Sequence, residues 1–254
     1  LFDHSIKADI AIFGSSKLIR ALDPKILEED NISVYNFGIE AASPEYTYNW
    51  YTNFFREYYP KPRLVILDIN WSMFTEFSFR KIEQDSRFYP LSEFINLTIH
   101  SSNWKESLLK RTALLNRAKD CNELTELTYN GYTPYPRTEK PKVLPYPELS
   151  DNFDTQLEFL KKLIHKIKED NAEVVLLIMP ELLREEIKKE DVFDKNMNLL
   201  LSDLEKEKVI TLDYRNLIEA DTMFYDLEHL NMEGAKIVSQ KLKDDLLRLT
   251  YIYN

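Results

Sequence analysis

Glycine is scarce in this sequence, with four residues among 254. Glycine tolerates positive φ angles and close backbone contacts better than any other residue, so a chain that uses it so rarely is expected to place it where one of these is needed. Gly14, Gly38 and Gly234 lie within the short motifs described below, and the fourth is Gly131.

Three further shortages exclude classes of protein. A single cysteine, Cys121, leaves no disulfide framework and no cysteine-built zinc cluster. Basic residues are outnumbered by acidic ones, 33 to 43, and the net charge of −10 disfavours a nucleic-acid-binding protein, which needs a basic face. No apolar run reaches the roughly 18 residues of a membrane span. No signal peptide is recognisable, and because the chain begins at Leu1, we expect a mature or truncated product.

What the sequence does contain is an alternation of strand-like and helix-like segments. A length of 254 residues and 44% hydrophobic content suit one large globular domain. The predicted strands are residues 8–13, 33–37, 63–69, 173–179 and 209–212, and the predicted helices are residues 43–59, 153–170, 191–206 and 231–249, with a broken crossover at 17–29. Strands that alternate with helices predict an α/β fold with a parallel sheet.

Residues 71–150 interrupt this alternation. Their periodicity is weak, with a helical pattern over 91–119 and a Tyr/Pro-rich piece at 131–136. We therefore expect a single domain, residues 1–254, with an insertion at about 71–150 that packs over one end of the sheet as a lid or a binding wall. Tyr132 and Tyr135 are candidates for a substrate-facing wall. A surface loop packed by its own aromatic side chains is the other interpretation.

Side chains with useful chemistry follow the ends of the predicted strands. They are Ser15 and Ser16 after the first strand, Gly38 after the second, Asn70 after the third, and Asp226 and His229 before the last helix. Because ligands bind beyond the carboxyl ends of parallel strands, we expect these residues to meet at one edge of the sheet.

These residues predict serine-based acyl chemistry. A serine hydroxyl needs a neighbouring base, and the base needs a third group that fixes its tautomer. Among the four histidines, His229 is the one with a carboxylate, Asp226, at this kind of spacing. Ser16 or Ser15 is then the nucleophile, and the backbone N–H groups of the nucleophile and of Gly38, with the Asn70 side-chain amide, are candidate oxyanion donors.

Four motifs in these segments resemble the conserved blocks of the SGNH (GDSL-type) hydrolase superfamily. They are Gly14-Ser15-Ser16, Asn36-Phe37-Gly38, Asp68-Ile69-Asn70 and Asp226-x-x-His229-Leu-Asn-x-x-Gly234. The resemblance implies a flavodoxin-like three-layer α/β/α sandwich with a five-stranded parallel sheet. It also implies esterase, deacetylase or acyltransferase chemistry without a metal or organic cofactor. It assigns Ser16 as nucleophile, Asp226 and His229 as its partners, and Ser16, Gly38 and Asn70 to the oxyanion hole.

The amino-acid sequences of the motifs are most similar to those of a bacterial branch of this superfamily that contains the D-alanyl-lipoteichoic acid biosynthesis and alginate-acetylation proteins. That resemblance implies an acylated small molecule or surface polysaccharide as substrate. It also implies membrane association through an N-terminal segment missing from this sequence, and an extracytoplasmic location in preference to a cytoplasmic one.

Three positions depart from the family pattern. Ser15 replaces the aspartate before the nucleophile, and Asp68 and Trp71 replace the glycine and aspartate around the third-block asparagine. An ionised, inward-pointing Asp68 is expected to be unfavourable beside an oxyanion. The alternative prediction is therefore a catalytically weak SGNH-like domain that binds glycan or a membrane acyltransferase partner. An α/β-hydrolase is disfavoured because a Gly-x-Ser-x-Gly elbow is absent.

Overall fold

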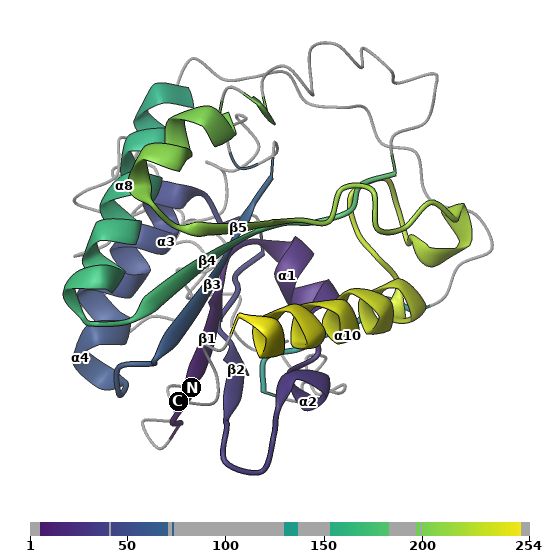
Figure 1. The fold of residues 1–254 in the computed structure, drawn as a ribbon, viewed down its shortest axis with the longest axis horizontal. Coiled ribbons are helices and arrows are strands. Elements are labelled where there is room, and N and C mark those ends of the chain that lie inside the picture. The colour runs from purple at the N-terminus through teal and green to yellow at the C-terminus, as the bar shows by residue number, and fades with distance from the viewer. Residues whose placement is uncertain are drawn as a thin grey trace, which may run out of the picture.

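The chain folds around a five-stranded sheet in which every neighbouring pair of strands is parallel (Figure 1). The computed structural model describes residues 6–40, 42–70, 73, 130–136, 153–182, 197–198 and 200–249. The strands are β1 (Ile10–Phe13), β2 (Val34–Asn36), β3 (Leu64–Ile69), β4 (Glu173–Ile178) and β5 (Ile210–Asp213), in the spatial order β2-β1-β3-β4-β5. This order confirms the predicted α/β fold, and each strand lies within two residues of its predicted bounds.

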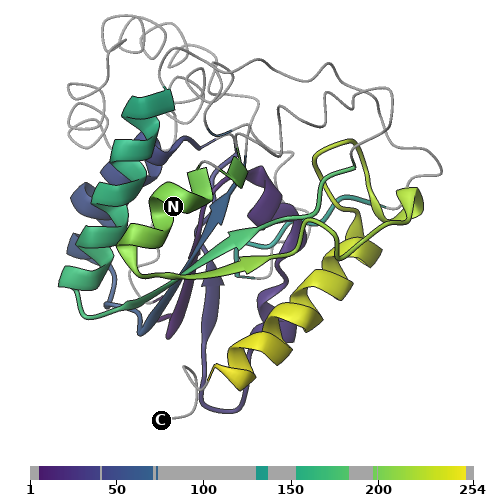
Figure 2. The same cartoon turned by 45° about the horizontal axis from the view of Figure 1, so that its top comes forward.

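Helices cover both faces of the sheet (Figures 1 and 2). One face carries α1 (Ser16–Ala21), α2 (Pro24–Leu27) and α10 (Met232–Arg248), and the other carries α3 (Pro44–Trp50), the π-helix η1 (Tyr51–Phe55), α4 (Arg56–Tyr58) and α8 (Phe153–Glu169). Short 3₁₀ turns, η5 (Glu205–Glu207) and η6 (Asp221–Met223), flank β5. None of the helices within the described ranges combines the length and the apolarity needed to cross a membrane.

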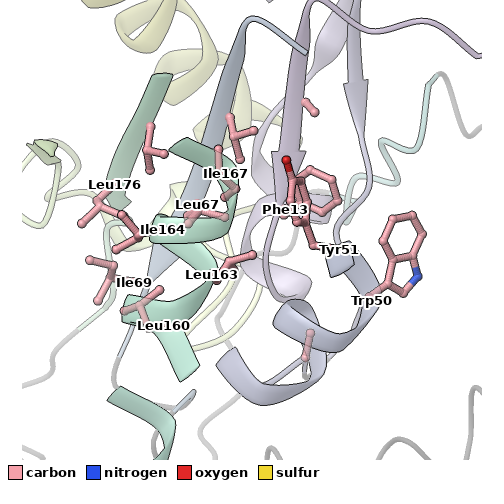
Figure 3. Packing of buried hydrophobic residues seen from close by; sticks show 14 of the residues in the cluster. Phe13, Trp50, Tyr51, Leu67, Ile69, Leu160, Leu163, Ile164, Ile167 and Leu176 are labelled. Carbon is pink, nitrogen blue, oxygen red and sulfur yellow. The ribbon is translucent and has the colours of Figure 1, made fainter. Parts of the chain in front are cut away.

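Two apolar cores lie on opposite faces of the sheet. On one face Phe13, Leu67 and Leu176 pack against α3, η1 and α8 (Figure 3). On the other face Ile12 and Ile66 pack against the helices of the α1, α2 and α10 side. A strand that is covered on both faces needs apolar residues at successive positions, which explains the continuous apolar runs in the sequence.

The main differences from the predicted helices have local causes. The predicted helix 43–59 contains the π-helical stretch η1 between α3 and α4. The crossover 17–29 forms two helices, because Pro24 begins α2 and Asp23 caps it. Of the predicted helix 191–206, residues 197–198 and 200–204 are helical. The predicted helix 91–119 lies outside the described residues, and the insertion at 71–150 stays a prediction.

Candidate active site

The turn after β1 places Ser16 at the carboxyl edge of the sheet. Ser15 adopts an extended conformation and caps α1, with its Oγ accepting a hydrogen bond from the backbone N–H of Lys17 at 3.3 Å. Serine is a favoured capping residue because its oxygen satisfies an N–H that has no partner within the helix. Ser16 is therefore the first residue of α1 and is partly exposed, whereas Ser15 is buried.

A tight turn before α10 holds Asp226 and His229 together. Asp226 Oδ1 accepts hydrogen bonds from the backbone N–H groups of Glu228 at 2.9 Å and His229 at 2.8 Å. The same carboxylate lies 2.9 and 3.0 Å from Nδ1 of the His229 ring. Asn231 then caps α10 by accepting from the N–H groups of Glu233 and Gly234. The spacing of the motif thus gives one turn that orients the imidazole and one cap that starts the helix.

These two turns meet, although 213 positions separate them in sequence: Ser16 Oγ lies 2.8 Å from Nε2 of His229. Because Asp226 binds Nδ1, that nitrogen is assigned the proton and Nε2 is left to accept one from Ser16. Burial favours a higher pKa for Asp226, but its hydrogen bonds to the His229 ring and to the backbone N–H groups of Glu228 and His229 outweigh it and hold the pKa below its usual range. The structure thus brings together the hydroxyl, imidazole and carboxylate predicted from the sequence.

The neighbouring serine has a different partner. Ser15 Oγ donates to Asp68 Oδ2 at 2.6 Å, and the Ser15 backbone N–H lies 3.2 Å from Asp68 Oδ1. Of the two serines that the sequence offered as nucleophile, Ser16 is the one in contact with His229.

Two of the three predicted oxyanion donors have protein acceptors in this structure. The Gly38 backbone N–H donates to Asn36 Oδ1 at 3.0 Å. The Asn70 side-chain amide donates to Asp68 Oδ2 at 2.8 Å and to Ser15 Oγ at 3.2 Å. Among the described residues, the Ser16 backbone N–H has no acceptor. The oxyanion role of Gly38 and Asn70 therefore stays a prediction.

Asp68, which was expected to be unfavourable beside an oxyanion if ionised and inward-pointing, is buried and accepts hydrogen bonds from its neighbours. The side chains and amides of Ser15 and Asn70 supply its hydrogen bonds. Burial raises the pKa of Asp68 to about 6 against the effect of these hydrogen bonds. Two departures from the family pattern, Ser15 and Asp68, are thus direct partners in the structure.

The Tyr/Pro-rich piece borders the site. The backbone N–H of Met232 donates to the Tyr135 carbonyl at 3.0 Å. The Tyr135 ring stacks on Tyr225 with centroids 4.1 Å apart and meets the His229 ring edge-on at 5.5 Å. Tyr132 is buried and offers little surface to a substrate, whereas Tyr135 is partly exposed. Tyr135 therefore remains the candidate wall residue.

Sequence reasoning missed a buried ion pair beside the nucleophile. Lys17 pairs with Glu181, and their side chains are 2% and 6% exposed. Burial favours a lower pKa for Lys17, but the charges of Glu181 and Glu228 outweigh it and raise the pKa. The backbone N–H of Leu182 also donates to the Leu227 carbonyl at 2.9 Å. The signal available in the sequence was a charged residue, Glu181, that follows the buried strand β4 by three positions.

No arrangement of three or more His, Cys, Asp or Glu side chains suited to a metal ion occurs within the described ranges.

Comparisons with known proteins find similar structures and little similar sequence. One protein-family profile matches residues 150–250, and no curated protein matches the chain. A GDSL-like lipase from Bacteroides thetaiotaomicron is similar at 10% identity with a TM-score of 0.49, over 94% of this chain and 88% of that one. A catalytic mutant of an acetylxylan esterase from Geobacillus stearothermophilus is similar at 12% identity with a TM-score of 0.49, over 95% of each chain. A family two carbohydrate esterase from Clostridium thermocellum, in complex with cellohexaose, is similar at 8% identity with a TM-score of 0.48, over 97% of this chain and 66% of that one.

Proposed function

We propose that this protein is an SGNH-type serine esterase or O-acyltransferase whose substrate is an acyl ester carried by a cell-surface glycan. The observation that supports this most directly is the 2.8 Å contact between Ser16 Oγ and His229 Nε2. The other ring nitrogen of His229 lies 2.9 Å from Asp226. A hydroxyl, an imidazole and a carboxylate in this order can activate a serine for attack on a carbonyl carbon.

In the proposed reaction, Ser16 Oγ attacks the acyl carbonyl carbon while His229 takes its proton. His229 then donates that proton to the departing alcohol oxygen, and the acyl group stays on Ser16. Water, or a second sugar hydroxyl in a transferase, attacks the acyl-enzyme with its proton going to His229. Cleavage of the ester returns that proton to Ser16. Asp226 stays ionised and stabilises the imidazolium, and no metal or organic cofactor is required.

The oxyanion that forms during attack needs hydrogen-bond donors. The Ser16 backbone N–H is one candidate, since it has no acceptor in the described part of the chain. Gly38 and Asn70 are the others, and in the proposed mechanism they release Asn36 and Asp68 when the oxyanion forms. One such donor is typically worth about 3 kcal/mol of transition-state stabilisation.

The substrate class comes from the resemblance to bacterial proteins that act on surface polymers. An acylated polysaccharide outside the cytoplasm, reached by a protein associated with the membrane, fits that resemblance. Both faces of the Tyr135 ring are covered, one by Tyr225 at 4.1 Å and the other by the Arg20 guanidinium at 4.3 Å, so its partly exposed edge would border a bound sugar or acyl chain.

The test is labelling with a fluorophosphonate probe that reacts with activated serines. We expect labelling at Ser16, located by peptide fragmentation, and its loss in Ser16→Ala. Ser33→Ala is the matched control. Ser33 lies at the opposite edge of the sheet, where its Oγ donates to Asp9 at 2.7 Å and has no histidine partner among the described residues. If folded wild-type protein shows no labelling, the enzyme proposal fails.

The alternative is a catalytically weak SGNH-like domain that binds glycan or a membrane acyltransferase partner. The N–H groups of Gly38 and Asn70 already donate to Asn36 and Asp68, and donors that are occupied in this way favour a catalytically weak site. Binding of an acetylated polysaccharide by a protein that is not labelled by the probe would support this alternative. Release of acetate from that polysaccharide, lost in Ser16→Ala, would exclude it.

A further inference from the structure

Asp68 is a buried carboxylate that lies directly under the turn carrying the nucleophile. Phe13 of β1 pairs with Leu67 of β3, so Gly14 runs beside Asp68. A Cβ atom on Gly14, whose φ is +154°, would lie 1.9 Å from Asp68 Oδ1. Glycine is therefore required at position 14 for the carboxylate to reach the turn.

The contacts of Asp68 determine how the Ser15 side chain is used. Ser15 Oγ has one proton and gives it to Asp68 Oδ2 at 2.6 Å. The lone pairs of the same oxygen then accept from the Lys17 N–H at 3.3 Å and from the Asn70 amide at 3.2 Å. Asp68 therefore fixes the orientation of the hydroxyl that caps α1.

The same carboxylate also fixes the backbone before Ser16. The Ser15 N–H lies 3.2 and 3.3 Å from the two oxygens of Asp68. The Asn70 amide, which follows the same strand, donates to Asp68 Oδ2 at 2.8 Å. One buried side chain thus holds the ends of β1 and β3 in a single arrangement, and Ser16 is the next residue along the chain.

We propose that Asp68 is a positioning residue for the acyl-transfer reaction, which orients the Ser15–Ser16 turn so that the Ser16 hydroxyl meets His229. The proposal rests on the function proposed above. Within the described residues, the hydrogen-bond donors to Asp68 are Ser15 and Asn70. Asp68 therefore acts through these two residues and has no contact with the reacting oxygen. The pairing also accounts for both unusual residues at once: the carboxylate that the family places at position 15 is supplied here from position 68.

The first experiment compares Asp68→Ala and Asp68→Asn with the wild type. The readouts are the rate of fluorophosphonate labelling at Ser16 and the kcat and KM for p-nitrophenyl acetate. A displacement of about 1 Å in a reacting group can cost about 100-fold in rate. We expect Asp68→Ala to lower the labelling rate and kcat by about 100-fold with KM nearly unchanged. Asp68→Asn keeps one acceptor oxygen, so its loss should be smaller.

Asp9→Ala is the matched control. Asp9 Oδ2 accepts from Ser33 Oγ at 2.7 Å and from the Ser33 N–H at 2.9 Å, which reproduces the Asp68–Ser15 pair at the other edge of the sheet. This variant should label at the wild-type rate. An equal loss in Asp9→Ala and Asp68→Ala would overturn the positioning role, because the effect would then be a general loss of stability.

The second experiment moves the carboxylate. In the double variant Ser15→Asp/Asp68→Gly, the carboxylate at position 15 can cap α1 and accept from Asn70. We expect its labelling rate to recover to within about tenfold of the wild type. A folded double variant as slow as Asp68→Ala would contradict the proposal, as would wild-type labelling in Asp68→Ala. Absence of labelling in the wild type would instead contradict the proposed function, so the two failures are distinguishable.

Discussion

Asp170 and Asp68 are carboxylates buried at opposite edges of the sheet, and their surroundings differ. At the amino edge Asp170 accepts from Arg56 Nε at 2.6 Å, Lys61 Nζ at 2.7 Å and the Tyr51 hydroxyl at 3.0 Å. Burial opposes ionisation of Asp170, but these partners hold its pKa at about 2. At the carboxyl edge Asp68 is bound by the neutral donors of Ser15 and Asn70, and burial raises its pKa to about 6.

The surroundings of Asp170 stabilise its ionised form in the folded protein, whereas those of Asp68 do not. An ionised Asp170 is favoured by folding, because two cations compensate for its burial. An ionised Asp68 is disfavoured by folding, since its burial outweighs the hydrogen bonds of Ser15 and Asn70 and the charge of Lys17. Costly polar groups of this kind are expected where function needs them. The carboxyl edge is also where Ser16 meets His229, the site of the proposed reaction.

The largest expected effect comes from the same substitution at each edge. Asp226→Asn should lower kcat by about 10⁴-fold, because an amide at position 226 favours the wrong tautomer of His229. Asp170→Asn should leave the kcat of the folded protein unchanged. Steady-state hydrolysis of p-nitrophenyl acetate, corrected for the folded fraction, measures both. A comparable loss of kcat in Asp170→Asn would remove the distinction between the edges.

The carboxyl edge also contains a buried ion pair, and breaking it should cost stability there. Glu181→Gln leaves the Lys17 ammonium, 2% exposed, without its carboxylate partner. Loss of one partner of a buried pair typically costs about 3–5 kcal/mol. Urea unfolding of Glu181→Gln should show this loss. The double variant Lys17→Met/Glu181→Leu should recover most of it, because neither charge of the pair remains. If the single variant is as stable as the wild type, Lys17 has another compensating partner.

The sequence predicted the elements whose signals are local. Five apolar runs predicted five strands, and Asn231 before an amphipathic stretch predicted the start of α10. Asp226 and His229 were predictable because one turn contains both. The pairing of Ser15 with Asp68 was not, since 53 positions separate them and each residue was interpreted by itself. The same holds for Lys17 and Glu181, which are 164 positions apart and meet because β1 and β4 end at one edge.

The pH dependence of stability should differ between the edges. The folded-state pKa of Asp170, about 2, lies below its usual 3.8, so its contribution of about 2 kcal/mol is present above pH 4 and is lost as pH falls toward 2. The folded-state pKa of Asp68, about 6, lies above 3.8, so its contribution of about 3 kcal/mol is present below pH 4 and is lost as pH rises through 6.

Urea unfolding between pH 2 and pH 8 tests this directly, with Asp170→Asn and Asp68→Asn as references. The stability difference between wild type and Asp170→Asn should be constant from pH 5 to 8 and shrink in acid. The difference between wild type and Asp68→Asn should shift in favour of the wild type as pH falls from 7 to 4. If the stability differences of the two variants from the wild type changed with pH in the same direction, the pKa values of Asp170 and Asp68 would be shifted in the same direction, and the predicted difference would be wrong.

The smallest expected effect concerns the aromatic border of the carboxyl edge. Tyr135 stacks on Tyr225 and meets the His229 ring edge-on at 5.5 Å, so it limits the rotation of the imidazole. Aromatic pairs of this kind contribute about 0.5–1.5 kcal/mol, which corresponds to about a 2- to 12-fold change in rate. Tyr135→Leu should therefore lower kcat for p-nitrophenyl acetate within that range, whereas Tyr135→Phe, which keeps the ring, should match the wild type. An equal loss in both variants would assign the effect to the hydroxyl group, and wild-type kcat in Tyr135→Leu would show that Ser16 and His229 hold their geometry without the ring.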